Sequence, residues 1–272
     1  MAVRKRAMKK RATRSPGRSR SLRKKLWIFD FDNTLARLEP EVDWAGGRRE
    51  LEPMLRAAGV PEDLFEKIPR GNLPLYSATR SRLLELAASG NGNLNLTQVR
   101  SILRSASKMI ERYEMAGVDR AAPLEGAFEL LTQLRKRGAR IAIVTSNSSR
   151  TIRRWFSINR YRSVIDQIVG RDSLLALKPA PEMLVRAFDL CKVRAADAVF
   201  IGDADSDYRA ANAVGIEFFG VAEREASRDA LAAAGARRIF SSPAALGIEL
   251  NILDSPVVAT GQNAETGSSR RS

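Results

Sequence analysis

The chain has 272 residues, 44% of them hydrophobic, with a formal charge of +15, one cysteine and no histidine. The absence of imidazole excludes Ser-His-Asp and Cys-His catalysis and histidine-bound zinc, so acid–base chemistry falls to carboxylates, lysine, tyrosine or cysteine. The single Cys191 excludes an intramolecular disulfide, and no apolar run approaches the roughly 20 residues that span a bilayer. We therefore expect a cytoplasmic protein without membrane insertion.

The positive charge is concentrated at the N-terminus. Residues 1–25 hold 12 of the 46 lysines and arginines and no acid, so the rest of the chain is close to neutral. This segment lacks the apolar residues of a core, and we expect a basic disordered arm over 1–25. Three roles stay open for it: weak binding to nucleic acid or another anionic surface, organelle targeting, or no role beyond solvation. A second polar segment, 251–272, is predicted to be a disordered tail.

Between these two segments, short apolar runs alternate with amphipathic ones. The apolar runs, each bounded by polar or turn residues as is typical of buried strands, are 26–29, 140–144, 198–202 and 216–222. The runs with helical periodicity are 125–138, 150–156, 181–193 and 206–215. This alternation predicts an α/β, Rossmann-like core with a largely parallel sheet, and ligands of such sheets bind beyond the C-terminal ends of the strands.

The segment 36–122 interrupts the alternation directly after the first predicted strand. It has no convincing strand, and its helical runs are 48–59, 77–89 and 96–117. We predict an α-helical cap domain over 36–122, inserted between two parts of the core, 26–35 and 123–250.

Four polar patterns follow the predicted strands or open the predicted helices. They are Asp30-Phe-Asp32, Thr145-Ser146-Asn147, Lys178-Pro179 and Asp203-Ala-Asp205-Ser-Asp207. Each pattern alone is explained more simply as a turn or a helix cap. The last one also has the spacing that begins an EF-hand loop, but Tyr208 and Val214 stand where that loop requires glycine and glutamate.

Taken together, the four patterns provide what phosphoryl transfer requires. Asp30 can attack phosphorus, and Asp32 can protonate the leaving oxygen and later activate water. Asp30 and Asp203 supply hard oxygen ligands for Mg²⁺, which also relieves the repulsion between neighbouring acids. Lys178 adds a cation beside the nucleophile, and Thr145 donates a hydroxyl hydrogen bond to a phosphate oxygen.

These patterns resemble the haloacid dehalogenase superfamily, and within it the phosphoglycolate phosphatase-like branch with a helical cap after the first motif. The resemblance extends from about Leu26 to Phe240 and rests on the stretches DFDNTL, IAIVTSN, LKPAPEML and FIGDADSDYRAANAVGI, with PLEGAFELL as the return from the cap.

The resemblance implies a role for each motif residue. Asp30 would be the nucleophile and Asp32 the general acid and base. Thr145, with Ser146 and Asn147, would bind the phosphate, and Lys178 would be the catalytic lysine. The ligands of Mg²⁺ would be Asp30, the main-chain carbonyl of Asp32, Asp203 and Asp207.

The leading hypothesis is therefore a Mg²⁺-dependent phosphatase that hydrolyses a small phosphate monoester through an aspartyl-phosphate. A phosphoglycolate-like compound, a sugar phosphate and a nucleoside monophosphate remain open as substrates, and the sequence does not define the oligomeric state. Within the superfamily that the chain resembles, the presence of the second acid, Asp32, disfavours dehalogenase and phosphonate-cleaving activity. A phosphomutase of the same fold, a nucleic-acid-associated protein acting through residues 1–25 and a catalytically silent relative are the alternatives.

Several residues of the predicted cap are candidates for binding a second anionic group of the substrate. A basic face exposed to solvent is the simpler explanation of these residues. They are Arg37, Arg48, Arg49, Arg70, Tyr76 and Arg80.

Overall fold

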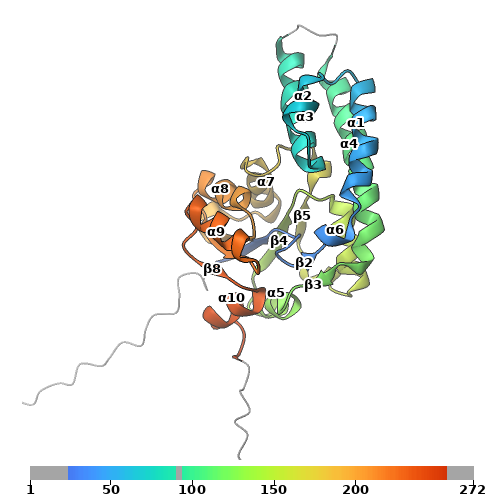
Figure 1. Ribbon diagram of the computed structural model, residues 1–272. Coiled ribbons are helices and arrows are strands. Elements are labelled where there is room, and N and C mark those ends of the chain that lie inside the picture. Colours follow the sequence, from blue (N-terminus) through green and yellow to red (C-terminus); the bar gives the residue numbers. More distant parts are fainter. Residues whose placement is uncertain (1–23, 90–93, 256–272) are drawn as a thin grey trace, which may run out of the picture.

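Short apolar runs form a six-stranded parallel sheet with the order β5-β4-β1-β6-β7-β8. The computed structural model (Figure 1) describes residues 24–89 and 94–255. The strands of the sheet are β1 (Leu26–Phe29), β4 (Arg140–Val144), β5 (Gln167–Val169), β6 (Ala198–Gly202), β7 (Glu217–Val221) and β8 (Ile239–Phe240). β1 lies near the centre, between β4 and β6, so its end is surrounded by the ends of its neighbours.

Helices cover both faces of the sheet. Leu26 and Ile28 of β1 pack into one hydrophobic cluster with α7 (Glu182–Cys191) and α8 (Asp205–Ala213). Trp27 and Phe29 point to the other face, into a cluster that includes α5 (Ala127–Lys136), α6 (Ser149–Ile158) and α10 (Pro243–Glu249). The alternation along β1 follows from the two-residue period of a strand. With α9 (Glu225–Ala234), these elements confirm the predicted α/β fold with a parallel sheet.

The predicted helical insert forms a bundle that extends away from the sheet (Figure 1). It consists of α1 (Trp44–Ala57), α2 (Asp63–Lys67), α3 (Asn72–Ser89) and α4 (Leu96–Gly117). Leucines such as Leu51, Leu75 and Leu103 are buried between these helices. At the base of the bundle, β2 (Ala36–Arg37) pairs antiparallel with β3 (Ala122–Pro123), which brings the two connections to the core together.

Short 3₁₀ turns complete the connections. They are η2 (Glu39–Glu41), η3 (Val118–Arg120), η4 (Arg162–Val164), η5 (Arg171–Ser173) and η6 (Ala195–Asp197). Of these, η2 and η5 carry residues of the site described below.

The ordered core extends beyond the predicted bounds at both ends. The Lys25 N–H donates to Asp197 O (2.8 Å), and Lys25 O accepts from Arg140 N (2.8 Å), so the ladder begins before residue 26. At the other end Ile252 is 4% exposed, packed under the last helix rather than lying in a free tail. Most of the basic arm predicted over 1–25 and of the tail predicted over 251–272 lies outside the described residues.

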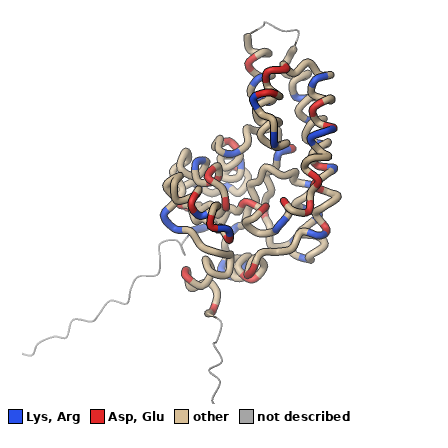
Figure 2. Tube along the Cα trace, in the orientation of Figure 1, with Lys and Arg blue, Asp and Glu red and all other residues tan. Residues whose placement is uncertain are grey.

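Charges of both signs are interspersed over the core and the helical bundle (Figure 2). Within the described part of the chain, no helix combines the length and the apolar character needed to cross a bilayer.

Candidate functional site

The C-terminal edge of the sheet carries the predicted site residues. Asp30 follows β1, Thr145 follows β4 and Asp203 follows β6. Because the three strands are parallel and adjacent, their last residues meet at one edge. A hydrogen bond from Asp30 N to Ile201 O (2.8 Å) fixes the first of these residues against β6.

Lys178 joins two of the acids by buried ion pairs. Its Nζ lies 2.7 Å from Asp30 Oδ1 and 2.6 Å from Asp207 Oδ1, and the lysine side chain is 4% exposed. Burial opposes the charge of Lys178, but the carboxylates of Asp207 and Asp30 outweigh it and raise the pKa of the ammonium. The structure therefore holds a permanent cation beside Asp30.

Three carboxylates converge around this lysine. Asp30, Asp203 and Asp207 each offer an oxygen within 4.8 Å of the others. Burial, and then the charges of Asp207 and Asp30, raise the pKa of Asp203 well above its usual range. Burial also raises the pKa of Asp207 to about 6, while Lys178 opposes that shift. Such a crowded set of hard oxygens is the donor set that divalent cations prefer.

Asp207 differs from the other two acids because both of its oxygens are engaged. Oδ1 pairs with Lys178, and Oδ2 accepts hydrogen bonds from Asp203 N (3.1 Å) and Ala204 N (3.0 Å). The carboxylate thus fixes the turn that presents Asp203. Asp205, the middle acid of the motif, is outside this group: its side chain is 48% exposed and pairs with Arg209 on α8 (3.3 Å).

Asp32 stands apart from the three converging acids. Its Oδ1 accepts hydrogen bonds from Leu38 N (2.9 Å) and Glu39 N (3.0 Å), at the start of the connection to the insert. Burial raises the pKa of Asp32 to about 7; the Asp30 charge adds to this shift and the two N–H donors reduce it. A carboxyl group with such a pKa can both give and take a proton near neutral pH.

The loop after β4 brings Thr145, Ser146 and Asn147 to the same edge. Thr145 Oγ1 donates to Asn147 Oδ1 (3.0 Å) and accepts from Asn147 N (3.3 Å). Thr145 and Asn147 are buried, whereas Ser146 is half-buried. The loop is therefore a tight turn with its own internal bonds, and the next helix, α6, begins directly after it.

A fully buried ion pair beneath this loop was not predicted from the sequence. Arg171 Nη1 lies 2.7 Å from Glu114 Oε1, and both side chains are 0% exposed. Glu114 also accepts from Asn147 Nδ2 (3.2 Å) and Ser148 N (3.0 Å), and Arg171 donates to Ser146 O (2.8 Å). The last helix of the insert is thereby connected to the loop that carries Thr145.

The burial of Glu114 could have been predicted from the sequence, but the burial of Arg171 could not. Glu114 falls on the same face of its predicted helix as Leu103 and Ile110, and an acid on an apolar face requires a buried partner. Arg171 lies in a short turn, η5, where no periodic pattern distinguishes it from a solvated arginine.

A pocket of about 340 Å³ opens beside Asp32, between the core and the insert. We call it the Asp32 pocket; Asp32 and Glu39 line it together with Trp44 of α1 and Gly71, Asn72, Leu73 and Pro74 at the start of α3. None of the arginines predicted to read a second anion lines it.

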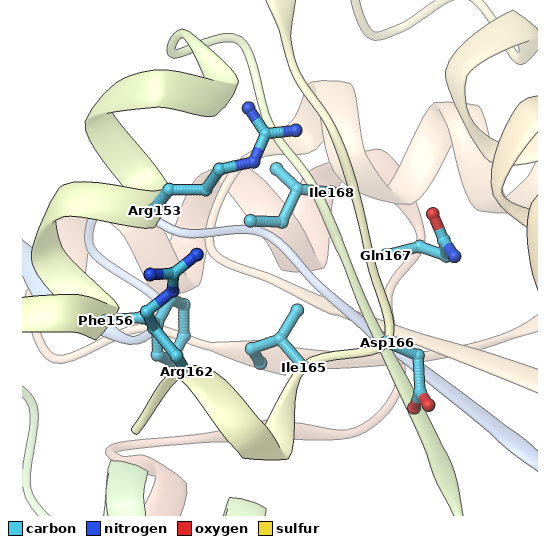
Figure 3. Close-up of a pocket in the computed structure, with 7 residues that line it drawn as sticks. All are labelled: Arg153, Phe156, Arg162, Ile165, Asp166, Gln167 and Ile168. Atoms are coloured by element: carbon cyan, nitrogen blue, oxygen red, sulfur yellow. The ribbon is translucent and has the colours of Figure 1, made fainter. Parts of the chain in front are cut away.

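A second pocket, of about 200 Å³, lies at the β5 edge of the sheet (Figure 3). Its acid, Asp166, turns away from Arg153 and Arg162 and pairs instead with Arg135 (2.7 Å). None of the predicted site residues lines this pocket.

Comparison with known proteins points to one family. The model of the haloacid dehalogenase-like hydrolases matches residues 89–221. The phosphoglycolate phosphatase of Rhodospirillum rubrum is 27% identical over 220 residues, which cover 81% of this chain and 88% of that protein. That of Pseudomonas fluorescens is 27% identical over 193 residues, covering 71% of this chain and 67% of that protein.

Solved structures agree on the fold. The CbbY protein of Rhodobacter sphaeroides, in complex with xylulose-(1,5)bisphosphate, has a TM-score of 0.55 at 21% identity over 82% of this chain and 96% of that one. A hydrolase from Pseudomonas syringae has a TM-score of 0.52 at 22% identity over 85% of this chain and 100% of that one. The chain is therefore similar in sequence and in fold to the haloacid dehalogenase-like hydrolases, and its similarity to phosphoglycolate phosphatases supports a phosphoric monoester hydrolase.

Proposed function

We propose that this hydrolase is a Mg²⁺-dependent phosphatase that cleaves a small phosphate monoester through an aspartyl-phosphate on Asp30. The observation that carries the proposal is the meeting of Asp30, Lys178 and Asp203 at one sheet edge, with Asp32 beside them. The small substrates in the names of the relatives, phosphoglycolate and a sugar bisphosphate, support a small ester.

In the first step of this mechanism an Asp30 oxygen attacks phosphorus while the ester P–O bond breaks. Asp32 gives its proton to the departing alkoxide, so the alcohol leaves neutral. In the second step Asp32 takes a proton from water, the resulting hydroxide attacks phosphorus, and the Asp30–phosphorus bond breaks to release phosphate. Lys178 and the donors of the loop at Thr145 would neutralise the phosphoryl oxygens in both steps.

The acids fit a divalent cation. Asp30 and Asp203 are the residues that would hold it, since both oxygens of Asp207 are engaged by Lys178 and by backbone N–H groups. When bound, Mg²⁺ would offset the charge of the crowded carboxylates and of the phosphoryl group. Asp207 would then act chiefly by fixing Lys178 and the turn at Asp203. The carbonyl of Asp32 remains a predicted ligand.

Removal of the metal tests the proposal directly. With Mg²⁺ present, the purified protein is expected to release phosphate from small monoesters, and EDTA is expected to stop the release until Mg²⁺ is restored. Phosphate release should be followed for a panel that includes p-nitrophenyl phosphate, a generic ester. Hydrolysis that continues unchanged in EDTA after dialysis would contradict the metal requirement.

Replacement of Asp32 separates the two chemical steps. For alkyl phosphates, we expect Asp32→Asn to lower kcat about 100-fold or more, because the alkoxide then departs without a proton. For p-nitrophenyl phosphate the leaving group needs no proton, so a burst of p-nitrophenol should precede slow turnover in stopped-flow absorbance. A variant that loses the same factor on both esters and shows no burst would speak against Asp32 as the proton donor.

The other roles considered for the chain remain predictions. A phosphomutase would use the same site and would transfer the phosphoryl group to a second hydroxyl instead of water. The basic segment 1–25 lies almost entirely outside the described residues, so nucleic-acid binding by it is tested separately, by the loss of salt-sensitive DNA or RNA binding after its deletion.

A further inference from the structure

The buried carboxylate of Glu114 accepts hydrogen bonds on both of its oxygens. Oε1 accepts from Arg171 Nη1 (2.7 Å) and from Asn147 Nδ2 (3.2 Å). Oε2 accepts from Ser148 N (3.0 Å) and from Thr151 Oγ1 (3.0 Å). All four donors belong to the core, whereas Glu114 lies on α4 of the insert. An ionised carboxylate can satisfy this many donors because it only accepts.

This carboxylate fixes the direction of the Asn147 amide. Because Asn147 Nδ2 donates to Glu114, Oδ1 is turned toward Thr145, whose Oγ1 donates to it (3.0 Å). Asn147 N donates in turn to Thr145 Oγ1 (3.3 Å). A reversed amide would set its oxygen against a carboxylate, two acceptors without a proton between them. The orientation of the Thr145 hydroxyl is thus determined by a residue of the insert, two hydrogen bonds away.

Arg171 fixes the peptide group that precedes Asn147. Its Nη1 donates to Ser146 O (2.8 Å) as well as to Glu114. Among the described residues, the N–H of Ser146 has no hydrogen-bond partner. Three successive residues of the loop, 146–148, are therefore each bound by the ion pair, while the N–H of Ser146 stays available to a ligand.

Stability alone does not account for this ion pair. The cost of removing two charges from water offsets much of their attraction, and replacing a buried pair by well-packed apolar side chains is often neutral or stabilising. An apolar pair, however, has no hydrogen-bonding direction. Glu114 and Arg171 are both 0% exposed, so the directions that they impose on the loop are not exchanged for bonds to water.

We infer that Glu114 and Arg171 are positioning residues for phosphate binding, which hold the loop at Thr145 in the form that receives a phosphoryl group. The inference rests on the proposed function, because it assigns residues that prepare that same site. Neither residue is assigned a contact with the phosphoryl group itself. When the loop is not held in advance, ordering it costs free energy each time phosphate binds, and affinity falls.

Binding of inorganic phosphate tests the inference without relying on turnover. Isothermal titration calorimetry with Mg²⁺ present measures the Kd. We expect Glu114→Gln to raise the Kd about 10-fold or more, because an amide cannot accept from all four donors. The Ki of phosphate against p-nitrophenyl phosphate should rise by the same factor. A merely structural role predicts lower stability with an unchanged Kd for the folded protein, and that result would overturn the inference.

The double variant Glu114→Gln/Arg171→Met keeps the test open if the single variant does not fold. It leaves no buried charge of this pair without its partner, and it still lacks the hydrogen bond to Ser146 O. We expect its Kd for phosphate to be raised at least about 10-fold as well. A folded double variant that binds phosphate as tightly as the wild type would contradict the positioning role.

Ser107→Ala and Glu111→Gln are the matched controls. Ser107 Oγ accepts from Arg171 Nε (3.2 Å), and among the described residues its side chain is not bonded to the loop 145–148. Glu111 undergoes the same substitution as Glu114 on the same helix, but it pairs with Arg150 (3.3 Å). Ser107→Ala should lower the melting temperature, and both controls should keep the Kd within about 2-fold. If Ser107→Ala raises the Kd as much as Glu114→Gln, general destabilisation explains the effect and the inference fails.

Failure of the proposed function has a different signature from failure of this inference. If the wild type binds phosphate but hydrolyses no ester, including p-nitrophenyl phosphate, the phosphatase proposal fails, and calorimetry still decides the role of Glu114. If it hydrolyses the ester and the folded variants share its Kd, only the inference fails. A wild type that neither binds phosphate nor hydrolyses an ester overturns both.

Discussion

Asp30→Asn is expected to abolish hydrolysis, with kcat reduced by about 10⁴-fold or more, because the amide oxygen is not a nucleophile toward phosphorus. The shape of the side chain is kept, so the fold should persist, although Lys178 then faces one carboxylate instead of two. Phosphate release measures the rate, and mass spectrometry of acid-quenched protein detects the phosphorylated intermediate in the wild type and its absence in the variant.

Asp205→Asn provides the control for this experiment. It removes an acid of the same motif region, but Asp205 is half exposed and pairs with Arg209 on its own helix. We expect its kcat to stay within about 2-fold of the wild type, since an exposed pair contributes little. Substantial activity in Asp30→Asn would require another nucleophile.

The second large effect is on stability. Arg171→Met is expected to lower the free energy of unfolding by about 3–5 kcal/mol, because it leaves the Glu114 carboxylate buried without its cation. Urea denaturation followed by tryptophan fluorescence measures the change. Adding Glu114→Gln should recover part of the loss, since the uncompensated charge is then removed.

Arg150→Met is the matched control for Arg171→Met. Arg150 pairs with Glu111, which lies on α4 one turn before Glu114, and this pair connects α4 to the core through α6 instead of η5. The Arg150 side chain is 72% exposed, so its replacement should cost less than about 1 kcal/mol. Equal losses in the two variants would show that burial does not determine the effect of the Arg171 pair.

The sheet and the acids at its edge were predictable because both depend on local patterns. A buried parallel strand needs a continuous apolar run, and the polar residue that follows it falls at the edge where ligands bind. Asp30, Thr145 and Asp203 all follow such runs. β5 and β8 were not predicted, since strands of three and two residues are too short to show a periodic pattern.

The parts of the site that were not predicted depend on how the insert packs against the core. The Asp32 pocket brings Asp32 together with the first residues of two insert helices. No sequence pattern predicts that these residues lie close together. Periodicity likewise could not show which arginines of the insert were free. Arg37 pairs with Glu223 and Arg80 donates to Leu174 O, so each binds a group on the core instead of awaiting an anion.

The buried pair beneath the loop that carries Thr145 also determines how the last helix of the insert is held. Arg171 donates to Ser107 Oγ and Ser107 O, in the middle of α4, while Glu114 holds the end of the same helix. Because Arg171 binds α4 at its middle and at its end, this helix is attached to the core at two points. The same contacts tie α4 to the loop that carries Thr145, because Glu114 also accepts from Asn147 Nδ2 and Ser148 N, so any displacement of the end of α4 would displace this loop as well.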